Sequence, residues 1–168
     1  ISSEEGASIF GYQVSDPERY GVVNLDKENN PINIEEKPLN PSSNIAITGL
    51  YFYDSNVCEY AKTIKPSDRG EYEITDLNNI YLDKKELSVE IMSNAFTWLD
   101  TGTHESFLEA SSFIATLQKR RGQIFASPEL VSLNKEWITK QEFEKLIKPL
   151  MKSNYGKSLS YVLNKNAI

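Results

Sequence analysis

A single carboxylate, Asp100, lies between an apolar segment and a glycine-containing turn in residues 98–103 (WLDTGT). An acidic side chain at such a turn can hold a hard cation above a phosphate group, because Mg²⁺ prefers a few carboxylate oxygens plus substrate phosphates to a full cage of protein ligands. The alternative is that Asp100 only orders the turn, since aspartate accepts hydrogen bonds from nearby backbone N–H groups. The spacing alone leaves both interpretations open.

Three other short segments combine charged side chains with turns: residues 19–21 (RYG), 35–38 (EEKP) and 68–71 (DRGE). Glu36 could accept hydrogen bonds from sugar hydroxyls, and Lys37 could bind a phosphate as a point charge. Arg69, next to a glycine in a loop, suits bidentate phosphate recognition. The alternatives are a plain turn glycine, a solvated strand end and an ordinary surface loop. Together with a metal at Asp100, these groups suit a sugar phosphate.

The composition excludes several other kinds of site. The 168 residues include one cysteine and one histidine, without the spacing of a zinc site or of a Ser–His or Cys–His mechanism. Catalysis would therefore depend on positioning and electrostatics. We expect Cys58 to be a small buried residue and His104 to be exposed in a first helical turn.

Charge and hydropathy indicate which partners to expect. The net charge of −6 argues against non-specific nucleic-acid binding, which needs a basic surface. No apolar run approaches the roughly 20 residues that span a bilayer. We therefore expect neither a nucleic-acid nor a membrane partner. The single cysteine allows no intrachain disulfide, which fits a cytoplasmic location.

Periodicity and turn signals predict an α/β protein with a mixed sheet, flanking helices and an all-helical C-terminal tail. Strands are predicted over 7–14, 21–25, 32–37, 45–53, 87–92 and 96–99, with 45–53 central because it is the most apolar. Helices are predicted from residue 54 or 55 to 64, from residue 100 or 103 to 121, and over 74–82, 129–133, 139–147 and 155–163. We expect Phe107, Ala110, Ile114 and Leu117 to form the buried stripe of the long helix.

The change in pattern near residue 127 predicts two parts. Residues 1–127 mix strands and helices, whereas residues 128–168 are purely helical. The tail contains more apolar side chains than three short helices can bury among themselves: Phe125, Leu130, Trp137, Ile138, Phe143, Leu146 and Ile147. Because a monomer rarely exposes such a patch, we expect the tail to form a subunit contact in a homo-oligomer.

Several motifs in a fixed order resemble the C-terminal portion of the glucose-1-phosphate thymidylyltransferases, also called dTDP-glucose pyrophosphorylases. They are residues 11–14 (GYQV), 16–23 (DPERYGVV), 35–38 (EEKP), 48–54 (TGLYFYD), 69–71 (RGE) with 73–76 (EITD), and 98–103 (WLDTGT). The resemblance covers nearly the whole chain and implies the Rossmann-like fold of nucleotide-diphospho-sugar transferases. Residues 1–127 would then be the sugar-phosphate-binding part of the sheet domain.

The resemblance implies a Mg²⁺-dependent reaction of dTTP with α-D-glucose 1-phosphate that gives dTDP-glucose and pyrophosphate, in dTDP-rhamnose and surface polysaccharide synthesis. The sugar pocket would be lined by Tyr20, Gly21, Glu36, Lys37, Ile47, where the family usually has valine, and Tyr51. Arg69 and Lys37 would hold the phosphate, and Asp100 would be one metal ligand. A homo-oligomer with an allosteric nucleotide site at a subunit interface is also implied.

The family's glycine-rich nucleotide loop, with its catalytic Arg and Lys and a second metal-binding Asp, has no counterpart in this sequence. We therefore expect no catalytic residue in this chain, and we expect the chain alone to be an inactive part of a longer enzyme. Two alternatives remain: a non-enzymatic module for sugar-phosphate binding or oligomerisation, and a UTP-dependent homologue. The base pocket that would decide the second alternative is not among these motifs.

Overall fold

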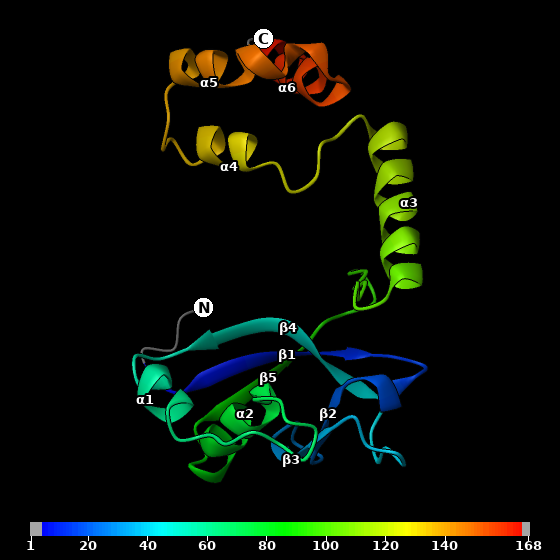
Figure 1. Cartoon of the computed structure of the whole chain (residues 1–168), viewed down its shortest axis with the longest axis vertical. Coiled ribbons are helices and arrows are strands. Elements are labelled where there is room, and N and C mark those ends of the chain that lie inside the picture. Colours follow the sequence, from blue (N-terminus) through cyan, green and yellow to red (C-terminus); the bar gives the residue numbers. More distant parts are fainter. Residues whose placement is uncertain (1–4, 166–168) are drawn as a thin grey trace. The chain divides into compact units, whose positions relative to one another are not determined.

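The computed structural model describes residues 5–165 (Figure 1) and divides into two compact units, one ending at Trp98 and the next beginning at Leu99. The sequence predicts a later division, after residue 127, so the two divisions differ in where they place residues 99–127. The predicted division into functional parts stays a prediction. In the range that the structure describes, no helix has the length and apolarity to cross a membrane.

The first unit is built on a mixed five-stranded sheet in the order β3-β2-β4-β1-β5. The strands are β1 (Ala7–Gln13), β2 (Gly21–Leu25), β3 (Pro31–Glu36), β4 (Ile45–Tyr53) and β5 (Leu87–Ile91), and a short turn of 3-10 helix, η1 (Pro17–Arg19), precedes β2. Strand β5 runs parallel to β1, whereas the β1–β4, β2–β3 and β2–β4 pairs are antiparallel. The predicted α/β class and the central position of β4 are confirmed.

The long pairing of β1 with β4 contains an irregularity, because the register shifts between Ile9 and Gly11. A Cβ atom on Gly11 would lie 2.6 Å from Cγ2 of Ile45 and 2.9 Å from Cδ1 of Ile91. Real Cβ atoms do not approach carbon atoms this closely, so only glycine fits here. A register shift of this kind is typical of a β-bulge.

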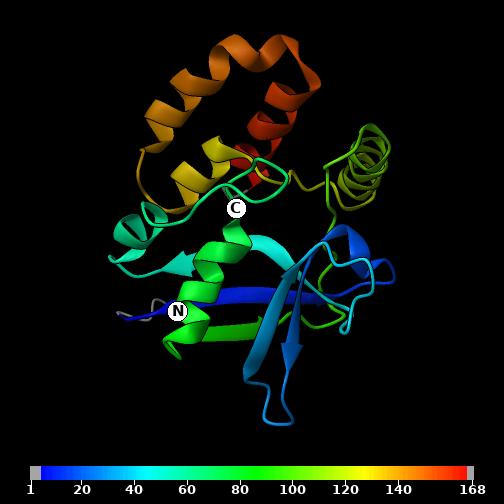
Figure 2. The same cartoon turned by 60° about the horizontal axis from the view of Figure 1, so that its bottom comes forward.

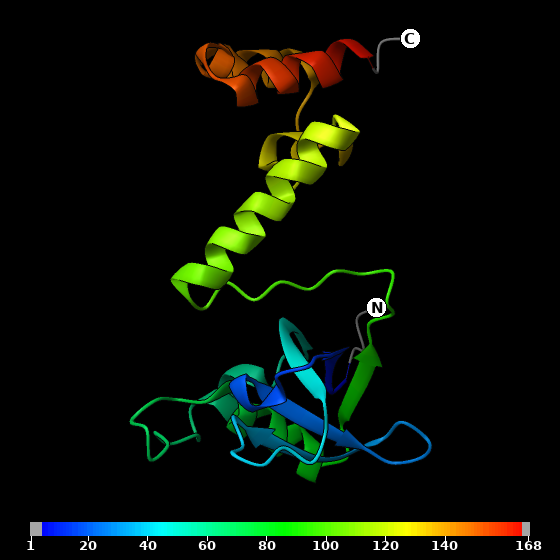
Figure 3. The same cartoon turned by 90° about the vertical axis from the view of Figure 1, so that its right-hand side faces the viewer.

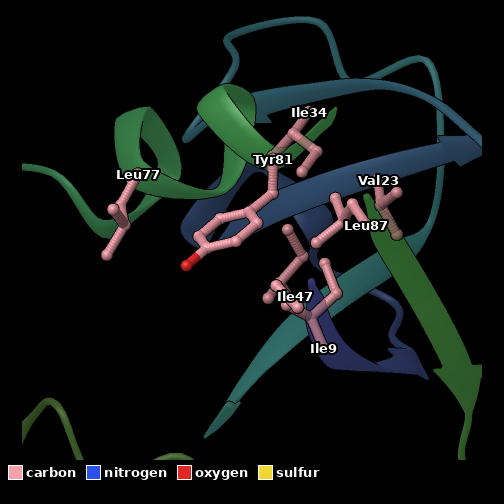
Figure 4. Packing of buried hydrophobic residues seen from close by; sticks show 8 residues of the cluster. Ile9, Val23, Ile34, Ile47, Leu77, Tyr81 and Leu87 are labelled. Atoms are coloured by element: carbon pink, nitrogen blue, oxygen red, sulfur yellow. The ribbon is translucent and has the colours of Figure 1, made fainter. Parts of the chain in front are cut away.

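Helix α2 (Ile74–Asp83) covers one face of the sheet, whereas the shorter α1 (Val57–Ala61) follows β4 (Figure 2). The buried Leu77 and Tyr81 of α2 pack among side chains from the strands (Figure 4). These are Ala7, Ile9, Val23, Ile34, Ile47 and Leu87. The Tyr81 ring is fully buried, and its hydroxyl donates a hydrogen bond to Asp54 at 2.8 Å. The apolar side chains of α2 thus anchor the helix to the sheet, mainly to β3 and β5.

The second unit is helical. It consists of α3 (His104–Arg121), α4 (Pro128–Asn134), α5 (Lys140–Ile147), the 3-10 helix η2 (Lys148–Lys152) and α6 (Asn154–Lys165) (Figure 3). Thr103 caps α3, and Thr139 forms a capping box with Glu142 at the start of α5. Phe143, Ile147 and Leu159 form a core of their own that draws in side chains from α4 and α6.

Three local predictions are wrong. Residues 96–99 form no strand. This segment has no strand partner for backbone pairing and is instead fixed by contacts of the Trp98 ring with Tyr12 and Tyr20. Cys58 is exposed, since α1 is only five residues long and packs through Val57 and Tyr60. Phe107 is 61% exposed, and only Ala110 of the predicted stripe is fully buried. His104 is exposed at the start of α3, as predicted.

Replacement of Phe143 by alanine tests whether the helical core holds the tail by itself. The fully buried ring leaves a cavity when removed, so we expect the tail to lose about 3 kcal/mol of stability. Leu146→Ala on the same helix is the control, because that side chain is 47% exposed and its loss should cost under about 1 kcal/mol. Hydrogen exchange should show faster exchange over residues 128–165 in Phe143→Ala and unchanged protection over the sheet. Equal effects of the two variants would contradict the assignment of this core.

Candidate functional site

The ends of β2 and β3 bring four of the predicted residues together. Gly21 pairs with Glu36 across the two strands, and the backbone N–H of Lys37 donates to the carbonyl oxygen of Tyr20 at 3.0 Å. A Cβ atom on Gly21 would lie 3.1 Å from Oε2 of Glu36, so the glycine leaves the carboxylate accessible. Lys37 is exposed and has a φ of 42°, a left-handed conformation that ends β3 and turns the chain into Pro38.

Glu36 points to the face of the sheet that α2 covers. It lies two residues after the buried Ile34, and the Oγ1 atom of Thr75 on α2 donates to its Oε2 atom at 2.5 Å. Glu35 points to the opposite face, where Ser42 donates to it at 3.3 Å. Alternation along β3 thus places Glu35 and Glu36 on opposite faces of the sheet. The Glu36 side chain keeps 23% of its surface exposed, so a ligand can reach the carboxylate.

Arg69 reaches this carboxylate from the loop before α2. Its Nη1 atom lies 3.9 Å from Oε1 of Glu36 and 3.9 Å from Oε1 of Glu73, and its Nη2 atom lies 2.8 Å from Oε2 of Glu71. Ser67 donates to Glu73 at 2.8 Å, which ties the loop to the start of α2. One guanidinium thus lies among three carboxylates, beside the hydrogen-bonding group of Glu36. A planar guanidinium in this place can bind a phosphate in bidentate fashion.

Strand β4 contributes Ile47 and Tyr51 on the face that α2 covers. Ile47 is 8% exposed and belongs to the core, whereas Tyr51 is half-buried. Burial raises the pKa of the Tyr51 phenol, and the negative charge of Glu36 raises this pKa further. The phenol therefore stays neutral over the physiological range, and its hydroxyl can donate to or accept from a sugar hydroxyl.

Tyr20 belongs to an aromatic cluster with Trp98 and Tyr12. The Tyr20 and Trp98 rings meet edge to face with centroids 5.1 Å apart, and the Tyr12 ring lies 6.0 Å from Trp98. The Arg19 guanidinium lies 5.3 Å from the centroid of the Tyr20 ring. The Tyr12 hydroxyl donates to the carbonyl oxygen of Phe96 at 3.1 Å and holds the segment before Trp98 against β1.

Asp100 belongs to the second unit, in the turn before α3. It is half-buried, and its Oδ2 atom accepts a hydrogen bond from the backbone N–H of Gly102 at 3.2 Å. This bond orders the turn. Across residues 5–165, no group of three or more His, Cys, Asp or Glu side chains could hold a metal ion. Asp100 fits Mg²⁺ as one ligand among phosphate oxygens, and the described residues do not form a complete metal site.

The geometry adds residues that the sequence analysis did not assign to the site. Thr75 holds Glu36, Glu73 lies beside Arg69, and Trp98 supports Tyr20. The available signal was the position of Glu73, four residues after Arg69 at the start of α2. Thr75 and Trp98 act through partners distant in sequence, so composition and spacing could not assign their roles.

Comparisons with known proteins identify the family of the chain. The nucleotidyl transferase family model matches residues 1–117. A glucose-1-phosphate thymidylyltransferase of Xanthomonas campestris is 48% identical over 165 residues, which are 98% of this chain and 56% of that protein. One of Mycobacterium tuberculosis is 43% identical over 166 residues, 99% of this chain and 58% of that protein. The chain thus spans a little more than half the length of these relatives.

Solved structures support the fold. A Bacillus anthracis crystal structure, described as a glucose-1-phosphate thymidylyltransferase in complex with sucrose, is 49% identical, with a TM-score of 0.58 over 65% of this chain and 43% of that one. A UDP-glucose pyrophosphorylase complexed with UDP-glucose is 24% identical, with a TM-score of 0.59 over 66% of this chain and 44% of that one, and supports the fold alone. The resemblance seen in the sequence is confirmed, and the chain belongs to the nucleotidyl transferase family.

Proposed function

We propose that this chain supplies the sugar-phosphate-binding part of a glucose-1-phosphate thymidylyltransferase, which makes dTDP-glucose and pyrophosphate from dTTP and α-D-glucose 1-phosphate. The observation that carries the proposal is the placement of Arg69 beside Glu36, itself held by Thr75. This arrangement puts a phosphate-binding cation next to a carboxylate that accepts hydrogen bonds from sugar hydroxyls. The identity to thymidylyltransferases favours dTTP over UTP as the nucleotide.

In the proposed reaction, a phosphate oxygen of glucose 1-phosphate attacks the α-phosphate of dTTP in line, the bond to the β-phosphate breaks, and pyrophosphate leaves. Glu36 and Tyr51 orient the sugar, Gly21 lets it approach the strand, and Arg69 with Lys37 holds its phosphate. Their contribution is positioning, since no side chain forms a covalent bond to the substrate. The groups that hold the nucleotide are expected outside this chain.

We propose Asp100 as one ligand of Mg²⁺, with phosphate oxygens as others. Bound there, the ion would neutralise charge that builds up on the phosphates during transfer. The inactivity of the chain alone, a cytoplasmic location and a place in dTDP-rhamnose and surface polysaccharide synthesis follow from the resemblance and stay predictions.

Binding of glucose 1-phosphate and of glucose to the purified chain tests the roles of Arg69 and Glu36. We expect Arg69→Gln to weaken glucose 1-phosphate binding by about tenfold or more and glucose binding little, because one charge-assisted bond to phosphate is lost. Glu36→Gln should weaken both. Arg120→Gln, which removes another exposed arginine, is the control and should change neither. Calorimetric titration measures the affinity of the unsubstituted chain and of the three variants for both ligands. An equal loss of glucose and glucose 1-phosphate binding in Arg69→Gln would contradict a phosphate role.

The exchange Asp100→Asn in the complete enzyme separates a metal ligand from a turn residue. Asparagine makes the same local backbone bond as aspartate but lacks the negative charge. If Asp100 is a metal ligand, the exchange should lower the kcat of the enzyme by about 100-fold or more and raise the Mg²⁺ concentration that the enzyme requires. The melting temperature should stay unchanged. The rate of pyrophosphate release, measured against Mg²⁺ concentration, distinguishes the two roles. A near-normal rate in Asp100→Asn would show that Asp100 only orders the turn.

A homo-oligomer formed through the helical tail is also proposed. Trp137 is 72% exposed and Leu146 47%, although Phe143 and Ile147 from the predicted patch are buried in the tail itself. Deletion of residues 128–168 should therefore shift the protein toward monomer or aggregate in analytical ultracentrifugation. Trp137→Ala should weaken the assembly without unfolding the tail, because its side chain lies outside the helical core. An unchanged oligomer in both variants would place the contact elsewhere.

A further inference from the structure

The buried amide of Asn78 on α2 is not explained by packing. The residue is fully buried, its Oδ1 atom accepts a hydrogen bond from the Tyr53 hydroxyl at 2.6 Å, and its Nδ2 atom has no hydrogen-bond partner among the residues that the structure describes. An unpaired buried donor opposes folding. A leucine of similar size would fill the position without this penalty. The amide therefore points to a role for its bond with Tyr53.

That bond holds a ring that lies against a candidate pocket residue. Tyr51 and Tyr53 are two residues apart on β4, so their side chains share one face of the sheet. Their rings are stacked, with centroids 5.9 Å apart and planes inclined by 15°. The centroid of the Tyr81 ring lies 5.5 Å from that of Tyr53. With its hydroxyl bound to Asn78, the Tyr53 ring offers Tyr51 a flat surface in one orientation.

The orientation of Tyr51 matters because its hydroxyl is a candidate partner for a sugar hydroxyl. Burial, and then the negative charge of Glu36, raise the pKa of its phenol and keep this hydroxyl protonated. Tyr53 reaches neither Glu36 nor the Arg69 loop through any interaction found among the described residues, so its effect on the pocket passes through the stacked ring. We propose that Asn78, through Tyr53, is a positioning residue that orients the Tyr51 ring in the sugar pocket. The inference rests on the proposed function only in its choice of ligand, glucose 1-phosphate. The fixed orientation of the Tyr51 ring does not depend on that function.

The proposal separates ring order from stability. Tyr53→Phe removes the hydroxyl and leaves Asn78 unpaired, so it should lower the melting temperature, free the Tyr51 ring and weaken binding of glucose 1-phosphate by about fivefold. Tyr53→Phe with Asn78→Leu removes both polar partners, so the melting temperature should return close to wild type while the ring stays mobile and binding stays weak. A purely structural role predicts that binding recovers with stability.

Tyr81→Phe is the matched control. It also removes one hydroxyl from a ring in the same cluster, here the donor to Asp54, and it leaves the Tyr53–Asn78 bond in place. It should lower the melting temperature without changing the mobility of Tyr51 or the binding of glucose 1-phosphate. Equal effects of Tyr53→Phe and Tyr81→Phe on Tyr51 would overturn the proposal, because they would show a general loosening of the core.

Two measurements on the 168-residue chain decide the question. Ring-labelled tyrosine NMR reports the flip rate of Tyr51 without any ligand, and calorimetry reports the affinity for glucose 1-phosphate. If the wild-type chain does not bind glucose 1-phosphate, the proposed function fails for this chain, and the flip rate alone still decides whether Asn78 orders the ring. An unchanged Tyr51 flip rate in both Tyr53 variants overturns the proposal.

Discussion

The packing of helix α2 on the sheet is the constraint on which the candidate site depends. Leu77 and Tyr81 hold the helix against the strands, and the same helix carries Thr75 and Asn78, which reach Glu36 and Tyr53. Hydrogen bonds weaken steeply as donor and acceptor separate or misalign. The apolar contacts that stabilise the sheet therefore also fix the polar contacts that shape the pocket.

The two charged side chains at the centre of the site, Glu36 and Arg69, lie in different environments. Glu36 is partly withdrawn from water beside Tyr51, and a carboxylate there needs a hydrogen bond and a nearby cation. Thr75 supplies the hydrogen bond and Arg69 the cation. The pairs that Arg69 makes on its exposed side are weak, because water competes for them. The arginine can therefore exchange its partner for an incoming phosphate, whereas Glu36 stays in place.

The two units show how each part of the chain acquires its own core. In the sheet unit, apolar side chains of α2 fill one face of the strands. In the helical unit, Phe143 and Leu159 serve the same purpose for short helices that would be unstable as isolated segments. The sheet core joins residues from all five strands and α2, whereas the helical core joins residues from neighbouring helices of the tail.

The sequence by itself determined the α/β class, the central position of β4, the capping box at Thr139 and the alternation that separates Glu35 from Glu36. These features follow from local propensity and from the two-residue period of a strand. The ordered motifs also determined the family. Only the tertiary structure decided that residues 96–99 form no strand, because a strand needs a partner that the local pattern does not reveal. It also decided that Thr75 holds Glu36 and that Asn78 holds Tyr53, since these bonds join residues 39 and 25 positions apart that meet only when α2 packs on the sheet.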